Sequence, residues 1–220
     1  MSETELVLFS GGPDSTILLK HLLQENKKVR VLYIEMGWAL RTQPRIKFQN
    51  VAANNVLNYL REKYGNFKYS QASILTTLDE ENEDKYFGTD HQWCAFFGST
   101  FCNNYNIKRM WAGNYTYTDL VVQKRDGKSE DYLYNGGLDM WMKAATKFLN
   151  DPPKYCTPKL NFNGTSIDRF KTKKEAWDSL EMDLKKMVRS CVSDKWFCGN
   201  CPKCWIAKEY NLRDNMGNPL

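Results

Sequence analysis

The residues with the clearest chemical potential form one short run, Ser10-Gly11-Gly12-Pro13-Asp14-Ser15-Thr16. An apolar stretch at 6–9 precedes it and apolar residues follow at helical spacing, so we expect the run to join a buried strand to a helix. Glycines let an anion approach the backbone closely, and the unpaired N–H groups at a helix N-terminus attract it. The hydroxyls of Ser10, Ser15 and Thr16 can add donors. The run therefore predicts a phosphate-binding turn.

Asp14 stands at the positive end of the expected helix, where its charge is favourable. Its carboxylate repels a phosphate directly, so we expect it to act through Mg²⁺ or a water molecule. The alternative is a glycine-proline turn that enters a helix without any ligand. A Walker-type loop is excluded, because the lysine that it needs beside the serine or threonine is missing.

Four of the seven cysteines lie together near the C-terminus, as Cys191, Cys198, Cys201 and Cys204 in the spacing C-x6-C-x2-C-x2-C. Four thiolates make a closed tetrahedral site, which predicts a structural Zn²⁺ ion that orders the C-terminal residues. An iron–sulfur cluster and unrelated buried cysteines are the alternatives. Each remaining cysteine could be a nucleophile for sulfur transfer, although lone cysteines are usually small buried hydrophobes.

Strand-like and helical patterns alternate along the first half of the chain. The expected strands are 6–9, 29–37, 67–74 and 107–113, and the expected helices follow Asp14 and cover 45–65, 93–105, the region around 138–149 and 173–188. This alternation predicts an α/β fold with a doubly wound, mostly parallel sheet. Ligands bind at the carboxyl ends of such strands, so Glu35, Met36 and Gly37 are candidates for the neighbourhood of an adenosine.

The domain organisation follows from the same patterns. Residues 1–165 are predicted to form the nucleotide-binding α/β domain, with lid-like loops at about 114–165, and 166–220 a helical and zinc-binding region. The segments 79–92 and 151–166 are expected to be loops.

The Ser-Gly-Gly-Pro-Asp-Ser run resembles the pyrophosphate loop of the N-type ATP pyrophosphatases, a fold of the adenine nucleotide alpha hydrolase type. Members of that superfamily bind ATP, transfer AMP to an oxygen of the substrate and release pyrophosphate. The resemblance implies that Ser10, Gly11, Gly12, Asp14, Ser15 and Thr16 hold the pyrophosphate with Mg²⁺, with Asp14 and Ser15 in the catalytic machinery.

Loop and cysteines together resemble the 7-cyano-7-deazaguanine (preQ0) synthase family of queuosine biosynthesis. That family ends in Ser-Cys followed by C-G-x-C-x-x-C, as in Ser190-Cys191 and "CGNCPKC" here. The segments "CTPKL" and "KKEAW" are similar to two further family motifs and place Lys173 on a family lysine. The family uses ATP and ammonia to convert the carboxylate of a deazaguanine to an amide and then a nitrile, and the resemblance suggests a homodimer.

Two family motifs are missing. "FGTDHQWC" stands where the family has Gly-Arg-Asn, and "GNYTYTDLVVQKRD" replaces its Tyr-Pro-Asp-Cys-Arg segment, so that Gly113 and Asp119 alone carry over there. We therefore expect an enzyme that adenylates a carboxylate, with 7-carboxy-7-deazaguanine as the leading substrate. The alternatives are a different amine acceptor, sulfur transfer to tRNA, and a nucleotide-binding partner subunit without catalysis.

Composition limits the partners. The 220 residues carry a net charge of +5, which suits a small anionic substrate and makes a dedicated nucleic-acid binder unlikely. No apolar run approaches the roughly 20 residues that span a bilayer, and the polar start is unlike a signal peptide, so a cytoplasmic protein is expected.

Three other side chains have a functional and a structural interpretation. His91, in the expected polar loop together with Asp90, could be a general base. His21 lies on the apolar side of the first helix and is expected to be packed. Trp111 could stack on a flat base, although a tryptophan within a strand is more often part of the core.

Overall fold

A computed structural model of the chain describes residues 4–37, 43–65, 67–75, 90–113, 153–156 and 173–189, and the single residues 145, 147, 149 and 204. In chain order the elements are β1 (Glu5–Phe9), α1 (Pro13–Gln24), β2 (Val29–Gly37), α2 (Gln43–Tyr64), β3 (Lys68–Leu75), α3 (Asp90–Asn104), β4 (Arg109–Ala112), β5 (Lys154–Cys156), α6 (Lys173–Asp178) and α7 (Met182–Met187). None of the helices in these ranges has the length and apolar character needed to cross a bilayer.

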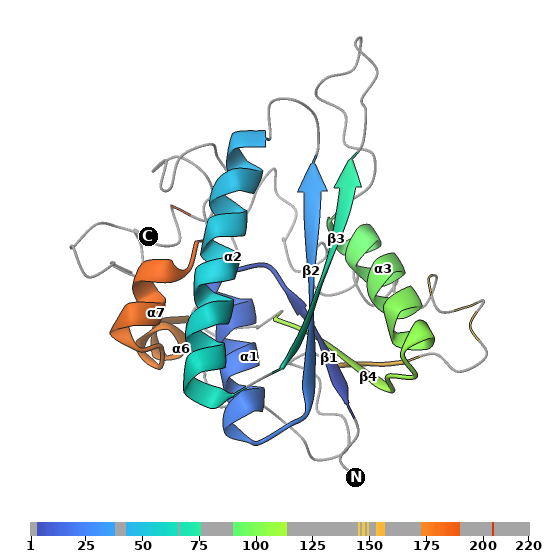
Figure 1. Ribbon diagram of the computed structural model, residues 1–220, viewed down its shortest axis with the longest axis horizontal. Helices are drawn as coiled ribbons and strands as arrows, with labels where there is room; N and C mark the ends of the chain where they lie inside the picture. Colours follow the sequence, from blue (N-terminus) through green and yellow to red (C-terminus); the bar gives the residue numbers. More distant parts are fainter. Residues whose placement is uncertain are drawn as a thin grey trace, which may run out of the picture.

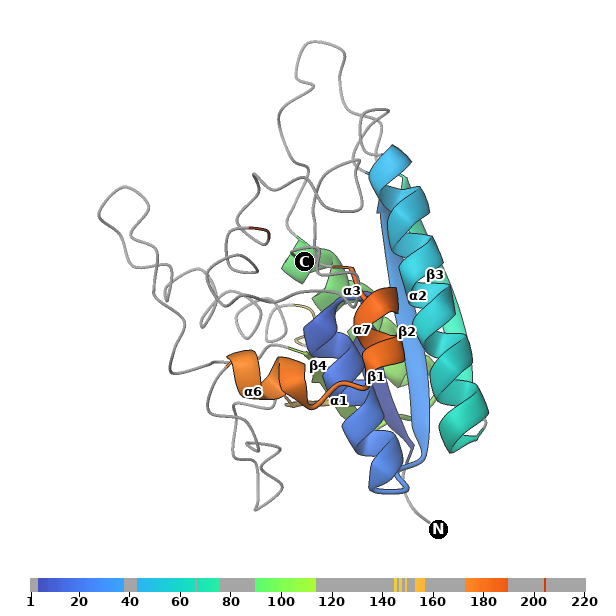
Figure 2. The same ribbon diagram turned by 90° about the vertical axis from the view of Figure 1, so that its left-hand side faces the viewer.

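The five strands form one sheet in the order β3-β2-β1-β4-β5, and every neighbouring pair is parallel. Helices lie on both faces of this sheet (Figure 1), with α1, α2, α6 and α7 on one face and α3 on the other. Turning the molecule by 90° separates the layers (Figure 2). The predicted α/β fold with a parallel, doubly wound sheet is confirmed.

Two apolar clusters hold these layers together. The larger joins α1, α2, α6 and α7 to one face of the sheet, and it includes Leu18, Leu19 and Val7, all fully buried. The smaller lies under α3 and includes Leu6 and Met110, also fully buried. Neighbouring residues of β1 therefore point to opposite faces, as the period of a strand requires. Because both faces of β1 are covered, its sequence is continuously apolar after Glu5.

The strand order changes direction beside β1. The chain adds β2 and then β3 on one side of β1, and it then returns to add β4 and β5 on the other side. In open α/β sheets the crevice at such a switch point, outside the carboxyl ends of the strands, is where ligands bind. The run 10–16 follows β1, and Gly113 follows β4, so both lie at this crevice.

Three predicted element boundaries are wrong. Residues 154–156, expected within a loop, form β5 because they pair with Arg109, Met110 and Trp111 of β4. Asp90 and His91, expected in a polar loop, instead begin α3. The single helix expected over 173–188 is two helices, α6 and α7.

The break between α6 and α7 has a polar cause. The hydroxyl of Ser179 donates to the carbonyl of Ala176 at 2.6 Å. The Ser179 carbonyl accepts from Nζ of Lys20 at 2.7 Å, so a side chain of α1 takes the place of a helical N–H. Glu181 then has an extended backbone (φ −61°, ψ 151°) and occupies the N-cap position of α7. A helix ends where a competing acceptor or donor replaces its ladder.

Candidate functional site

The turn between β1 and α1 is organised by two serine hydroxyls. The Oγ atoms of Ser10 and Ser15 lie 3.0 Å apart, and the Ser15 hydroxyl also receives the backbone N–H of Ser10 at 3.2 Å. The backbone N–H of Gly12 donates to the Ser10 Oγ at 3.3 Å. Gly12 is the N-cap of α1 and no side chain caps the helix, while Pro13 takes the first helical position. An uncapped helix start of this kind is suited to an anion.

Gly11 is required by both its backbone angle and its neighbour. Its φ is +75°, and a Cβ at this position would lie 2.9 Å from the backbone nitrogen of Ala53 in α2. Close to this contact, the amide Nε2 of Gln49 donates to the carbonyl of Ser10 at 3.2 Å. The first half of α2 therefore supports the turn from outside, and a small residue at position 53 permits the close approach.

Gly113 closes the site from the side of β4. A Cβ on Gly113 would lie 2.6 Å from the backbone nitrogen of Ser15 and 2.8 Å from the carbonyl carbon of Asp14. The end of β4 therefore touches the first turn of α1 through a residue that has no side chain. The structure brings the predicted residues Ser10, Gly11, Gly12, Asp14, Ser15 and Gly113 together at one point.

Thr16, the last residue of the run, is fully buried. Its Oγ1 makes no hydrogen bond within the described ranges. This orphaned hydroxyl and the uncapped start of α1 fit the binding of phosphates at this turn, while Gly11 and Gly113 let α2 and β4 pack closely against it. Asp14, in the first turn of α1, is half-buried and is the acidic side chain here that could hold Mg²⁺ beside those phosphates.

Glu35 lies in a polar network at the carboxyl-terminal part of β2. Its Oε2 accepts from Nε2 of Gln71 at 2.8 Å and from Nδ2 of Asn50 at 3.3 Å. The Oδ1 of Asn50 accepts from the hydroxyl of Tyr33 at 2.6 Å. Two consecutive residues of α2 therefore contact the two predicted parts of the site: Gln49 bonds to Ser10 of the turn at 10–16, and Asn50 bonds to Glu35. Met36 and Gly37 end β2, and the side chain of Met36 is not described.

A C-terminal residue that the sequence did not suggest, Arg189, also reaches the turn. Its backbone N–H donates to the carbonyl of Gly11 at 3.1 Å. Its carbonyl oxygen lies 3.5 Å from the position of a Cβ on Gly12. The Arg189 side chain is buried, and its Cζ lies over the ring of Phe48 at 5.6 Å.

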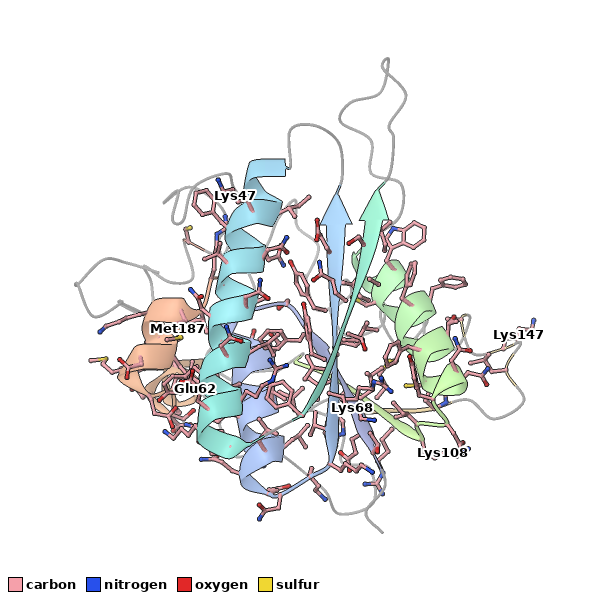
Figure 3. All side chains as sticks on the ribbon, in the orientation of Figure 1. Lys47, Glu62, Lys68, Lys108, Lys147 and Met187 are labelled. Carbon is pink, nitrogen blue, oxygen red and sulfur yellow. The ribbon has the colours of Figure 1, made fainter. Side chains whose placement is uncertain are left out.

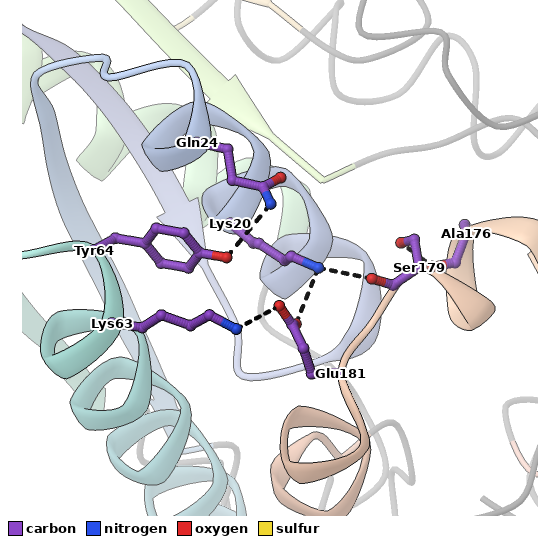
Figure 4. Close-up of polar contacts among 7 residues, drawn as sticks. All are labelled: Lys20, Gln24, Lys63, Tyr64, Ala176, Ser179 and Glu181. Atoms are coloured by element: carbon purple, nitrogen blue, oxygen red, sulfur yellow. Dashed lines mark hydrogen bonds and ion pairs between the residues drawn. The ribbon is translucent and has the colours of Figure 1, made fainter.

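Glu181 attaches the same C-terminal segment to α1 and α2 (Figure 4). Its two carboxylate oxygens meet Nζ of Lys20 at 2.9 Å and Nζ of Lys63 at 2.8 Å. Partial burial raises the pKa of Glu181, but the hydrogen bonds from Lys63 and Lys20 outweigh it and lower the pKa to about 2. In turn, the hydrogen bond to Glu181 raises the pKa of Lys63. This ion cluster holds residues 179–181 against the two helices.

A pocket of about 220 Å³ lies elsewhere, between α2 and α7. Its lining residues are Asn55, Asn58, Tyr59, Glu62 and Met187. Figure 3 labels Glu62 and Met187 on the two facing helices. Its α2 residues follow the part of the helix that touches the turn, so this pocket is separate from the predicted site.

The cysteine site falls mostly outside the described residues. Cys191, Cys198 and Cys201 are among those left undescribed, and Cys204 is buried. Within the described ranges no group of three or more metal-binding side chains occurs. The Zn²⁺ site stays a prediction, as does the role of Lys173, whose backbone begins α6 and whose side chain is not described.

The structural interpretations of three other side chains are confirmed. His21 is buried and its Nε2 lies 3.0 Å from a carboxylate oxygen of Glu25. Trp111 is buried and donates from Nε1 to Glu5 at 2.6 Å, so it does not stack on a ligand. Cys102 is buried, and burial raises the pKa of its thiol to about 12, which makes it a poor nucleophile.

Comparison with known proteins gives distant structural neighbours. No protein-family model matches the chain, and no curated protein matches it. A predicted subunit of tRNA methyltransferase from Methanocaldococcus jannaschii is 19% identical with a TM-score of 0.37, over 74% of this chain and 73% of that one. The U34-tRNA thiolase NcsA from Methanococcus maripaludis, solved with its [4Fe-4S] cluster, is 16% identical with a TM-score of 0.46. That match covers 97% of this chain and 65% of the thiolase.

Proposed function

We propose that the chain is an ATP-dependent enzyme that activates a carboxylate by adenylation and releases pyrophosphate. One observation carries the proposal: an uncapped helix N-terminus at the switch point of the sheet is lined by glycines whose Cβ atoms would collide with Ala53 and Ser15. Because no side chain caps this helix, its first N–H groups can be offered to a large anion, and the glycines allow the turn to pack closely between α2 and β4.

In this reaction, an oxygen of the substrate carboxylate attacks the α-phosphorus of ATP. The bond between that phosphorus and the bridging oxygen breaks, and pyrophosphate leaves with the electron pair. Ammonia then attacks the acyl carbon and displaces AMP, while its surplus proton passes to solvent. Mg²⁺ supplies charge neutralisation for the departing pyrophosphate. The backbone of Gly11–Ser15 and the Ser15 hydroxyl position the pyrophosphate, and Asp14 holds the cation.

The finer assignment rests on the family resemblance. The substrate proposed is 7-carboxy-7-deazaguanine, with the amide or the nitrile as product, and Lys173 contacts the phosphates or the substrate carboxylate. The nitrile requires a second ATP: the amide oxygen attacks the α-phosphorus and releases pyrophosphate, AMP then leaves with that oxygen, and two protons pass to solvent. Zn²⁺ on the four C-terminal cysteines has a structural role, and the proposed enzyme is a cytoplasmic homodimer. The rewritten segment at 113–126 follows β4 directly in the sequence, so a difference in the base that is bound is expected to arise there.

Pyrophosphate release tests the reaction and the acceptor together. The zinc-loaded protein is incubated with ATP and Mg²⁺, with and without 7-carboxy-7-deazaguanine and ammonium, and the base is then analysed by mass spectrometry. We expect release that depends on the acid, with replacement of an oxygen by NH or conversion to the nitrile. Release that depends instead on another amine or on tRNA would replace the substrate but keep the adenylation.

A matched pair of aspartates separates chemistry from stability. Asp14 and Asp183 both lie in the first turn of a helix, and Asp183 is exposed on α7 away from the turn. Asp14→Asn is expected to slow pyrophosphate release by about 100-fold, whereas Asp183→Asn leaves it unchanged. Absence of pyrophosphate release from the wild-type protein with every acceptor would reject the enzyme in favour of a nucleotide-binding subunit.

A further inference from the structure

Arg189 is a buried cation beside the run 10–16, whose own side chains are neutral apart from one acid. The run 10–16 contributes glycines, a proline and hydroxyl side chains, and Asp14 is its charged residue. A pyrophosphate carries several negative charges, while a helix N-terminus offers roughly half a positive charge. A buried arginine beside the turn would add to the positive charge that Mg²⁺ and Lys173 supply in the proposed function.

A second buried cation, Lys20, lies within α1 and holds the C-terminal segment. Lys20 donates to the carbonyl of Ser179 at 2.7 Å and forms an ion pair with Glu181 at 2.9 Å. Arg189, by contrast, makes its backbone contact with the turn itself, through the carbonyl of Gly11. Its side chain is 6% exposed, so its position is fixed by packing.

The direction of the Arg189 side chain is given by Phe48. The guanidinium carbon lies over the Phe48 ring, and Gln49, the next residue, holds the carbonyl of Ser10. The guanidinium therefore lies beside the first half of α2, close to the phosphate turn. A guanidinium carries N–H donors in a planar fork that matches the oxygens of a phosphate.

We propose that Arg189 is a phosphate-binding residue of this site: its backbone fixes the Gly11 turn and its guanidinium contacts the phosphates of the nucleotide. The inference rests on the proposed function, because it assumes that the turn binds a nucleotide. In this proposal Arg189, which lies two positions before Cys191 in the sequence, takes a direct part in ligand binding.

The test compares three ligands and two arginines. ATP, inorganic pyrophosphate and adenosine are titrated calorimetrically into the wild-type protein, Arg189→Gln, Arg189→Lys and the control Arg61→Gln. Arg61 is matched because its guanidinium also lies over a phenylalanine, Phe67, at 5.1 Å, but at the other end of α2. Thermal unfolding of each variant reports on folding.

Arg189→Gln is expected to lower the affinity for ATP and for pyrophosphate by about 10- to 100-fold, the usual effect of losing a charge-assisted hydrogen bond. Its affinity for adenosine should stay within about twofold of the wild-type value. Arg189→Lys keeps the charge and should recover part of the loss. Arg61→Gln should bind all three ligands as the wild type does.

Two results would overturn the inference while the proposed function stands. In one, Arg189→Gln binds ATP as tightly as Arg61→Gln does. In the other, the affinity of Arg189→Gln for adenosine falls as much as its affinity for ATP and its melting temperature falls, which shows a purely structural role. A wild-type protein that binds neither ATP nor pyrophosphate would instead reject the proposed function and this inference together.

Discussion

Replacing Glu181 with glutamine should destabilise the protein in a pH-dependent way. The carboxylate joins Lys20 of α1 to Lys63 of α2, and these lysines hold its pKa at about 2 against an ordinary value of 4.5. A fall of about 2.5 units corresponds to at most about 3.4 kcal/mol of folding free energy. Because Lys63 faces solvent and screening weakens its attraction, we expect Glu181→Gln to cost about 1–2 kcal/mol at pH 7.

The sign of the pH dependence follows from the lowered pKa. The unfolded carboxyl titrates near its ordinary value, so the stabilisation is complete above about pH 4.5 and is lost as the pH falls toward 2. The difference in unfolding free energy between wild type and Glu181→Gln should therefore shrink to less than half by pH 3. Urea denaturation at pH 7, 5 and 3 measures it.

The control is Asp178→Asn, which removes exposed ion pairs with Lys174 and Lys185 from the neighbouring helix. Such exposed pairs are worth little, so the control should lose less than about 0.5 kcal/mol at every pH. The reasoning is refuted if Glu181→Gln costs no more than Asp178→Asn at pH 7. It is equally refuted if the cost is the same at pH 7 and pH 3.

Two further predictions concern the turn and the core. Gly11→Ala should lower the free energy of unfolding in urea by about 2–4 kcal/mol, because it adds a collision with Ala53 to an unfavourable φ. The control Gly65→Ala, with φ +88° and open space around it, should lower it by about 1 kcal/mol. Equal losses would contradict the close approach of Gly11 to Ala53. Iodoacetamide at pH 8 should leave buried Cys102 unmodified in the native protein and modify it in urea, as peptide mass mapping would show. Half-buried Cys94 should react sooner in the native protein. Labelling of native Cys102 at the rate of Cys94 would contradict its burial and its raised pKa.

The parts of the fold that the sequence predicts well are those with a strong local signal. Strand β2 begins and ends at the predicted residues, since its apolar run is long and Gly37 closes it. Helix α2 ends before Gly65, which has φ +88° as expected of a glycine that terminates a helix. The turn at 10–16 is recognisable in the sequence because two glycines, a proline, an acid and three hydroxyl residues rarely occur together between a strand and a helix.

The missed features depend on partners far away in the chain. Strand β5 has three residues next to two prolines, and it exists because the edge of β4 pairs with it. The break after Asp178 depends on Lys20, and no local pattern indicates which lysine reaches a carbonyl of another segment. No local pattern distinguishes Gln49 from other polar helix residues either, because its contact with the Ser10 carbonyl depends on how α2 packs beside the turn.

The C-terminal segment is fixed to α1 at two separate points. Glu181 is held at Lys20, near the middle of the helix, and Arg189 is held at Gly11, before its first residue. Residues 181–189 therefore run back along α1 toward the crevice, and their apolar side chains Leu184 and Val188 are buried in the core between these points. The backbone hydrogen bond from Arg189 to the Gly11 carbonyl therefore ties the end of this segment to the turn at 10–16.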